Sequence, residues 1–321
     1  MNEIDFTTFQ DEKFVLHRVK FTILLTLQIP AILLSLLIFF YFFTHRTILH
    51  IRQNQALFLL LIINFIQLTF DLPMIIHFNR LGYVSPTKSS YCTWWTFLEY
   101  ILNAASEMLM ATISIQRHIL IFHSNLFNNR LNRYIFHHLP LLICIIYPII
   151  LYLIIIVFDF SCDGTQWDYS SNVCGLANCY LVYDKVLGSF DWAFNNGLPV
   201  LVIIFANIGL IIRVLRQKRR GQGIISWKKQ RKLTLQLLSI SSIYFLGWFP
   251  NIFIGIIQQL FIPGFISNIQ FDYIFDLLYL IYLLMPWICL GLFPEFIKWI
   301  RKFFVKEYQR GNTIRPTNHF N

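Results

Sequence analysis

Seven long apolar stretches, separated by shorter polar segments, set the pattern of the chain. They cover residues 21–44, 56–77, 94–115, 139–158, 192–215, 233–257 and 274–293. Each is long enough for a helix that crosses the hydrocarbon core of a bilayer, which takes about 20 residues. Apolar residues follow one another without the alternation of barrel strands, and backbone groups in lipid must be paired within the element. The pattern predicts an all-α membrane protein, a bundle of seven transmembrane helices.

Composition supports this prediction, because 56% hydrophobic and only 13% charged residues in a chain of 321 exclude an ordinary soluble domain. Basic residues are concentrated in the polar segments that follow the first, third and fifth stretches. The segment 213–232 alone holds nine basic residues and no acid. Short cytoplasmic loops retain Lys and Arg, so we expect the N-terminus outside and the C-terminus inside a multi-pass plasma-membrane protein.

The same charge distribution bears on partners. The net charge is +10, but the basic residues lie mostly beside the membrane stretches. Anionic lipid headgroups are therefore the expected partners, and nucleic acid is not. We divide the chain into an extracellular N-terminus (1–20), a seven-helix domain (21–293), and an amphipathic helix with a cytoplasmic tail (294–321). In the last segment, a helix would place Phe296 and Ile300 on one side and the basic residues Lys298 and Arg301 on the other. This pattern is typical of a short helix lying on the inner leaflet.

The cysteines fall into two groups. Cys144 and Cys289 lie inside apolar stretches, where a thiol behaves as a small apolar side chain. Four others are expected on the oxidising outer side, where disulfides persist: Cys92, Cys162, Cys174 and Cys179. We predict a bridge from Cys92 to the long outer loop, with Cys174, Cys162 or Cys179 as the partner.

Prolines interrupt six of the apolar stretches, and each removes one helical hydrogen bond. They are Pro30, Pro73, Pro148, Pro199, Pro250 and Pro286. This placement predicts a bundle of kinked helices.

Three short motifs carry a family resemblance. They are Gln116-Arg117-His118 after the third stretch, Gly247-Trp248-Phe249-Pro250 in the sixth, and Met285-Pro286-Trp287-Ile288-Cys289 in the seventh. Their positions are similar to those of the Asp-Arg-Tyr, Cys-Trp-x-Pro and Asn-Pro-x-x-Tyr motifs, and the chain resembles the rhodopsin-like (class A) G-protein-coupled receptors over nearly its whole length. The resemblance implies a receptor that activates a heterotrimeric G protein.

The resemblance also assigns roles. It implies G-protein coupling through Gln116, Arg117 and His118, and a conformational switch formed by Tyr244, Trp248, Pro250 and Pro286. Gln116 cannot pair ionically with Arg117, and the sixth stretch is preceded by KKQRK, which offers no acid. We therefore expect no ionic lock on the arginine and some activity without ligand.

Acids inside or beside the stretches suggest where a ligand binds. Burying a carboxylate costs free energy unless it faces a cavity or a partner. They are Asp71, Glu99, Glu107 and Asp276. Glu99 lies about two helical turns below Cys92 and resembles in position the carboxylate of amine receptors. The predicted ligand set is Glu99, Asn103, Trp248, Asp276 and Tyr279, and the ligand is a cationic small molecule or a basic peptide.

One alternative is an ion-coupled or proton-coupled transporter that uses Glu99 and Glu107, although no internal repeat is visible. An enzyme is not expected, since neither HExxH nor GxSxG occurs. We predict no metal site. We also predict no cofactor; retinal in particular is not expected, because its Schiff base needs a lysine within 274–293 and there is none.

Overall fold

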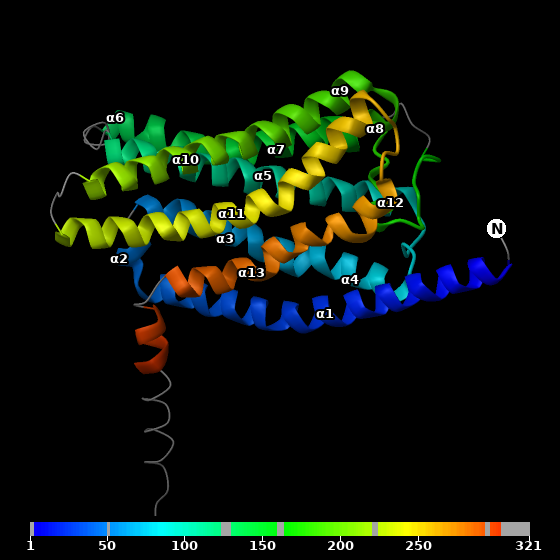
Figure 1. Cartoon of the computed structure of the whole chain (residues 1–321), viewed down its shortest axis with the longest axis horizontal. Helices are drawn as coiled ribbons and strands as arrows, with labels where there is room; N and C mark the ends of the chain where they lie inside the picture. The colour runs from blue at the N-terminus through cyan, green and yellow to red at the C-terminus, as the bar shows by residue number, and fades with distance from the viewer. Residues whose placement is uncertain are drawn as a thin grey trace, which may run out of the picture.

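The computed structural model describes residues 3–49, 52–122, 130–158, 164–219, 224–292 and 296–302. Within these ranges the chain is helical apart from short turns and loops, and it has no strand. The long helices run side by side along one axis (Figure 1). The all-helical prediction is confirmed for the described part of the chain.

Several long rods are built from helical segments that follow one another directly. The elements are α1 (Glu3–Thr44), α2 (Arg46–Leu49), α3 (Arg52–Ile66), η1 (Gln67–Asp71), α4 (Leu72–Leu81), α5 (Ser89–Phe122), α6 (Arg130–Arg133), η3 (Tyr134–His138), α7 (Leu139–Tyr152), η4 (Leu153–Val157), η5 (Asn172–Leu176), α8 (Cys179–Tyr183), α9 (Lys185–Phe190), η6 (Asp191–Gly197), α10 (Leu198–Arg219), α11 (Ile224–Leu260), α12 (Ser267–Ile269), η7 (Gln270–Ile274) and α13 (Asp276–Leu292).

Judged by length and composition alone, six rods in the described ranges are long and apolar enough to cross a membrane. They are 13–44, 54–81, 130–157, 185–212, 238–260 and 267–291. The remaining predicted stretch, the third along the chain (94–115), lies in α5, whose 34 residues also exceed the length required. α5 carries more polar residues than its neighbours, and those that are buried are Thr96, Glu99, Asn103, Ser106, Glu107, Ser114 and Gln116. It packs against α3, α7 and α10, so its polar side chains face protein.

The two ends of the bundle carry different features. The end with the Cys92–Cys174 disulfide is called the disulfide end, and the opposite end, with Arg117, is called the arginine end. The first predicted stretch is extended at the disulfide end, because α1 begins at Glu3 and includes most of residues 1–20 as helix.

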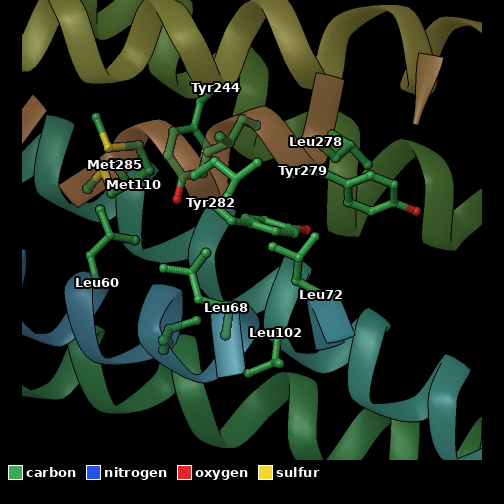
Figure 2. Packing of buried hydrophobic residues seen from close by; sticks show 14 of the residues in the cluster. Leu60, Leu68, Leu72, Leu102, Met110, Tyr244, Leu278, Tyr279, Tyr282 and Met285 are labelled. Atoms are coloured by element: carbon green, nitrogen blue, oxygen red, sulfur yellow. The ribbon is translucent and has the colours of Figure 1, made fainter. Parts of the chain in front are cut away.

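A continuous apolar core fills the centre of the bundle (Figure 2). It gathers side chains from α3, η1, α4, α5, α11 and α13, among them Leu60, Leu68, Leu72, Leu102, Met110, Tyr244, Leu278, Tyr279, Tyr282 and Met285. Large apolar side chains also cover the outside of the bundle, as in Leu33, Phe43 and Phe205. An apolar exterior of this kind is suited to a lipid solvent.

Residues 296–302 form a further helical segment that turns away from α13 at the arginine end (Figure 1). Phe296 is fully buried, and its ring lies 5.0 Å from that of Tyr41 on α1. Trp299 stacks on Phe296 and also contacts Tyr41 at 5.5 Å. These contacts fix where the segment leaves the bundle, while its placement on a membrane surface stays a prediction. The rest of the predicted region 294–321 lies outside the described residues.

Candidate functional site

A short loop folds into the disulfide end of the bundle and covers its centre. Residues 167–176 are called the lid. Within it Val173 and Cys174 are buried, and Val173, Cys174 and Leu176 have left-handed backbone conformations with φ between 50° and 52°. A β-branched residue rarely adopts such a φ, because its Cβ crowds the backbone. The lid conformation must therefore be held by its contacts with the bundle.

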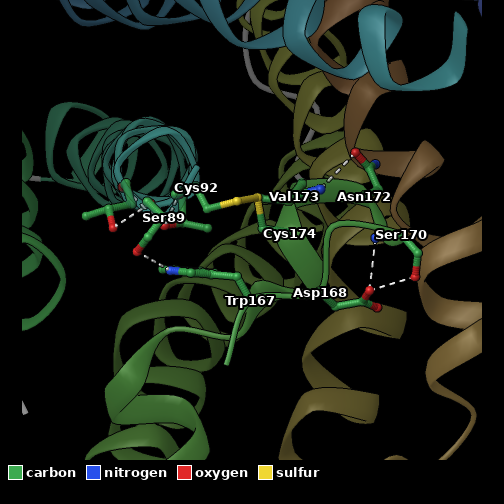
Figure 3. Close-up of a disulfide and its surroundings, with 10 residues drawn as sticks. Ser89, Cys92, Trp167, Asp168, Ser170, Asn172, Val173 and Cys174 are labelled. Atoms are coloured by element: carbon green, nitrogen blue, oxygen red, sulfur yellow. Dashed lines mark hydrogen bonds between the residues drawn. A yellow bond between two sulfur atoms is a disulfide. The ribbon is translucent and has the colours of Figure 1, made fainter. Parts of the chain in front are cut away.

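Three tethers hold the lid, and Figure 3 shows two of them, the disulfide and the hydrogen bond of Trp167. Cys174 is joined to Cys92 of α5 by a disulfide, which selects Cys174 from the three predicted partners. Trp167 donates its indole N–H to Ser89 Oγ over 3.0 Å, and Asn172 donates from Nδ2 to the Tyr279 hydroxyl over 2.7 Å. Cys179 is also disulfide-bonded, and Cys162 lies outside the described residues. The lid is thus linked to both α5 and α13.

Asp168 organises the turn before the buried part of the lid. It accepts hydrogen bonds from the Ser170 backbone N–H and the Ser170 and Ser171 hydroxyls at 2.5–2.9 Å. Partial burial of Asp168 works against ionisation, but these donors outweigh it and hold the pKa of the carboxyl below its ordinary value. Asp168 is therefore an anion at neutral pH that stabilises the turn.

Beneath the lid lies a small cavity that brings together three of the predicted ligand residues. Glu99 and Asn103 of α5 and Trp248 of α11 line it, and Val173 and Leu176 of the lid close it. Its volume is about 30 Å³, which is room for about one water molecule. With the lid in this position the cavity cannot hold a ligand of ordinary size.

The other two predicted ligand residues have partners inside the protein. Tyr279 is fully buried and accepts from Asn172 of the lid. Asp276 pairs with Lys20 of α1, whose Nζ lies 2.8 Å from the carboxylate. A neighbouring ion pair joins Lys13 to Asp272 at 3.7 Å. The extended α1 thus neutralises the acids on the α13 side of the disulfide end.

A second, larger cavity opens between α1, α4, the lid and η7. Its volume is about 1010 Å³. Phe21 and Phe78 form apolar parts of its wall, and Arg18, Arg80 and Asn172 are among its polar lining residues. Because Asn172 belongs to the lid, this cavity and the small one share a wall.

The predicted switch residues lie along α11 and α13, below the small cavity. Trp248 is buried and reaches the cavity, while Tyr244, one turn away, lies beside Ser106 and Glu107 of α5. Gly247 allows α11 to approach α13, because a Cβ there would lie 2.7 Å from Ile281. A change in the packing of Trp248 would therefore alter contacts of α11 with both α5 and α13.

At the arginine end, the three predicted coupling residues point in different directions. Gln116 donates from Nε2 to the His137 carbonyl of η3 over 3.1 Å. The His118 ring donates to the Ala206 carbonyl of α10. Successive helical residues are about 100° apart, so Arg117 faces between these two contacts. Gln116 binds η3, which agrees with its having no ionic role toward Arg117.

The sequence matches the family described as 7 transmembrane receptor (rhodopsin family) over residues 36–290. The chain belongs to this rhodopsin receptor family. Membership confirms the predicted class and accounts for α5 as a transmembrane helix despite its polar residues. A comparison with curated proteins gives no match to this receptor.

The receptor also contains a buried polar cluster that the sequence analysis did not identify. Asp191 accepts from the Tyr152 hydroxyl at 2.7 Å, the Tyr180 hydroxyl at 2.8 Å and Asn195 Nδ2 at 2.7 Å. Its exposed fraction is 1%, although it follows a polar segment in the sequence. The spacing of Asp191 and Asn195, one helical turn apart, was the available signal.

Proposed function

We propose that this receptor binds a cationic ligand in the cavity beneath the lid and activates a heterotrimeric G protein from its arginine end. The observation that carries the proposal is that Glu99 and Trp248 line one cavity. Glu99 supplies an acceptor for a cationic group, and Trp248 belongs to the helix predicted to move. Ligand binding and the switch therefore meet without an intermediate residue.

Ligand binding requires the lid to move. A cavity of about 30 Å³ is far below the roughly 300–1,000 Å³ of ordinary ligand sites. Displacing Val173 and Leu176 would open this space toward the larger cavity of about 1010 Å³, since the adjacent lid residues Asn172 and Val173 line the larger and the smaller cavity, respectively. The ligand, an amine or a basic peptide, enters from the disulfide end, which we place outside the plasma membrane on the basis of the basic segments.

The response travels along α11. Proline inside a helix leaves a carbonyl without its donor and provides a bending point. Pro250 lies two residues beyond Trp248, so altered packing of Trp248 swings the arginine end of α11 outward and exposes Arg117 to the G protein. In the sequence, the residue before Arg117 is Gln116 and the KKQRK segment has no acid, so neither offers the carboxylate of an ionic lock that would oppose this movement. Family membership favours this receptor function over transport through Glu99 and Glu107.

The ligand part of the proposal is tested with a panel of amines and basic peptides on cells that express the receptor. Glu99→Gln should lower the potency of an active cationic compound at least tenfold, because it removes the anionic partner. Glu107→Gln is the matched control, since Glu107 lies about two turns away on the same helix and does not line the cavity. Equal potency at wild type and Glu99→Gln would exclude Glu99 as the anchor.

A further inference from the structure

One face of α1 lines the larger cavity at the disulfide end. Phe14, His17, Arg18 and Phe21 occupy positions i, i+3, i+4 and i+7 of the helix, so they lie on the same side, and all four line the cavity. The His17 ring donates from Nδ1 to Asn79 Oδ1 of α4 over 3.0 Å. This contact joins α1 to α4 and fixes two sides of the cavity relative to each other.

The charges that line this cavity are not balanced. Three cationic side chains, Lys13, Arg18 and Arg80, line it together with two acids, Asp168 and Asp272. Asp272 pairs with Lys13 at 3.7 Å, and Asp168 accepts three hydrogen bonds from its own turn. Neither Arg18 nor Arg80 forms an ion pair with the part of the chain that the structure describes. Two guanidinium groups are therefore available to an anion.

The two arginines are suited to a carboxylate. A guanidinium group presents five N–H donors in a planar fork that matches both oxygens of a carboxylate. Arg18 lies over the Phe14 ring, with its Cζ 5.4 Å from the ring centroid, and the two side chains share the cavity side of α1. Arg80 belongs to the last turn of α4. The cavity thus has a cationic group on its α1 side and another on its α4 side.

The rest of the wall favours a ligand with an apolar body. Phe21, Phe78 and Phe271 come from α1, α4 and η7, and their rings would gain free energy if an apolar ligand covered them. The volume of about 1010 Å³ lies at the upper end of ordinary ligand sites, which is roughly 1,000 Å³. Ser170 and Ser171 of the lid add polar groups, which suits a water-soluble ligand better than a membrane lipid.

We propose that the larger cavity is a second ligand site, which takes an organic carboxylate with an apolar body. The carboxylate lies at Arg18 and Arg80, and the apolar body lies against Phe21, Phe78 and Phe271. The site differs from the small cavity in the sign of the charge that it takes. The lid forms one of its walls and does not have to open for this ligand to bind.

The test uses pyrenebutyrate, a fluorescent carboxylate with an aromatic body, and its uncharged analogue pyrenebutanol. Both are titrated into the purified full-length receptor in phosphatidylcholine nanodiscs, with empty nanodiscs as the blank. Pyrenebutyrate should bind saturably and about tenfold more tightly than pyrenebutanol. Arg18→Gln and Arg80→Gln should each weaken pyrenebutyrate binding roughly three- to tenfold and leave pyrenebutanol binding unchanged. Lys185→Gln is the control, since Lys185 is exposed at the same end and does not line the cavity.

The proposal is overturned if the wild type binds both probes equally, if binding above the blank does not saturate, or if both arginine variants behave like Lys185→Gln. The comparison of the two probes on the wild type needs no variant, so it decides the matter even where a substitution prevents folding. No cationic ligand and no G protein enters these measurements. Failure of this site therefore leaves the proposed signalling function standing, and failure of the signalling function leaves this site standing.

Discussion

Asn64 of α3 donates a hydrogen bond from Nδ2 to the backbone carbonyl of Tyr282 in α13, over 3.1 Å. In a regular helix that carbonyl would accept the N–H of the residue four positions later. That residue is Pro286, which has no N–H. The side chain of one transmembrane helix thus replaces the donor that proline removes from another, and Pro286 does not leave the Tyr282 carbonyl unpaired in the core.

Gln28 makes the corresponding contact at another proline. The backbone N–H of Leu72 reaches back five residues to the Gln67 carbonyl, so the next carbonyl in this register is that of Leu68. Its donor would be Pro73. Gln28 of α1 supplies the hydrogen bond instead, from Nε2 over 2.7 Å. Two prolines of the bundle are therefore each paired with an amide from a neighbouring helix.

The first prediction concerns this pairing. Asn64→Ala should lower the free energy of unfolding by about 1–2 kcal/mol, since a buried carbonyl loses its donor. In a Pro286→Ala background residue 286 regains its N–H, so the effect of Asn64→Ala should shrink to a few tenths of a kcal/mol. Thermal unfolding of the wild type, the two single variants and the double variant gives the coupling energy between Asn64 and Pro286. Strictly additive effects would show that Asn64 does not act through the proline.

Gly255 provides a second prediction. A Cβ at this position would lie 2.5–2.6 Å from atoms of the Trp192 ring, closer than such contacts occur. Gly255→Ala should therefore destabilise the receptor by about 1–3 kcal/mol despite the better helix propensity of alanine. Gly291→Ala is the control, because no atom lies within 4 Å of a Cβ there. An unchanged Tm for Gly255→Ala would mean that α11 and η6 are packed differently.

The third prediction concerns the tether between the lid and α13. Asn172→Ala and Tyr279→Phe each remove the hydrogen bond between these side chains, so amide hydrogen exchange in residues 167–176 should accelerate roughly five- to tenfold in both. Tyr183→Phe is a suitable control, since Tyr183 is 69% exposed. If exchange in the lid is unaltered by Tyr279→Phe, this tether does not hold the lid closed.

Asp168 makes a fourth prediction, on pH. Its folded-state pKa is lowered, so its contribution to stability is complete above the ordinary aspartate value of 3.8 and disappears as pH falls through the folded-state pKa. The Tm difference between wild type and Asp168→Asn should be constant from about pH 5 to 8 and vanish only in stronger acid. A difference that changes near neutral pH would point to another group.

The fold could be predicted from the sequence to a large extent, because the length of an apolar stretch is set by the bilayer and does not depend on distant residues. The stretch 94–115 was recognisable for this reason even though α5 is the least apolar rod. The start of α1 at Glu3 was not foreseen, because its first residues are polar and mix both charges. Their helical state depends in part on contacts such as Lys20 with Asp276, which the local sequence does not encode.

The site was predicted only in part. Glu99, Asn103 and Trp248 meet because helical periodicity and the spacing from Cys92 and Pro250 place them at similar depth. Cys174 could not be singled out, since three loop cysteines were equivalent by counting. The left-handed turn at Val173 was also not predictable, because valine itself disfavours that conformation and only the disulfide and Asn172 impose it.

The most direct test of the signalling claim is ligand-free nucleotide exchange on a panel of heterotrimeric G proteins, in cells that express wild type or Arg117→Ala at equal surface level. Because Gln116 stands before Arg117 in the sequence and the KKQRK segment has no acid, we expect measurable exchange on at least one G protein with the wild type and its loss in the variant. Absence of exchange with well-expressed wild type, or equal exchange by Arg117→Ala, would contradict the account.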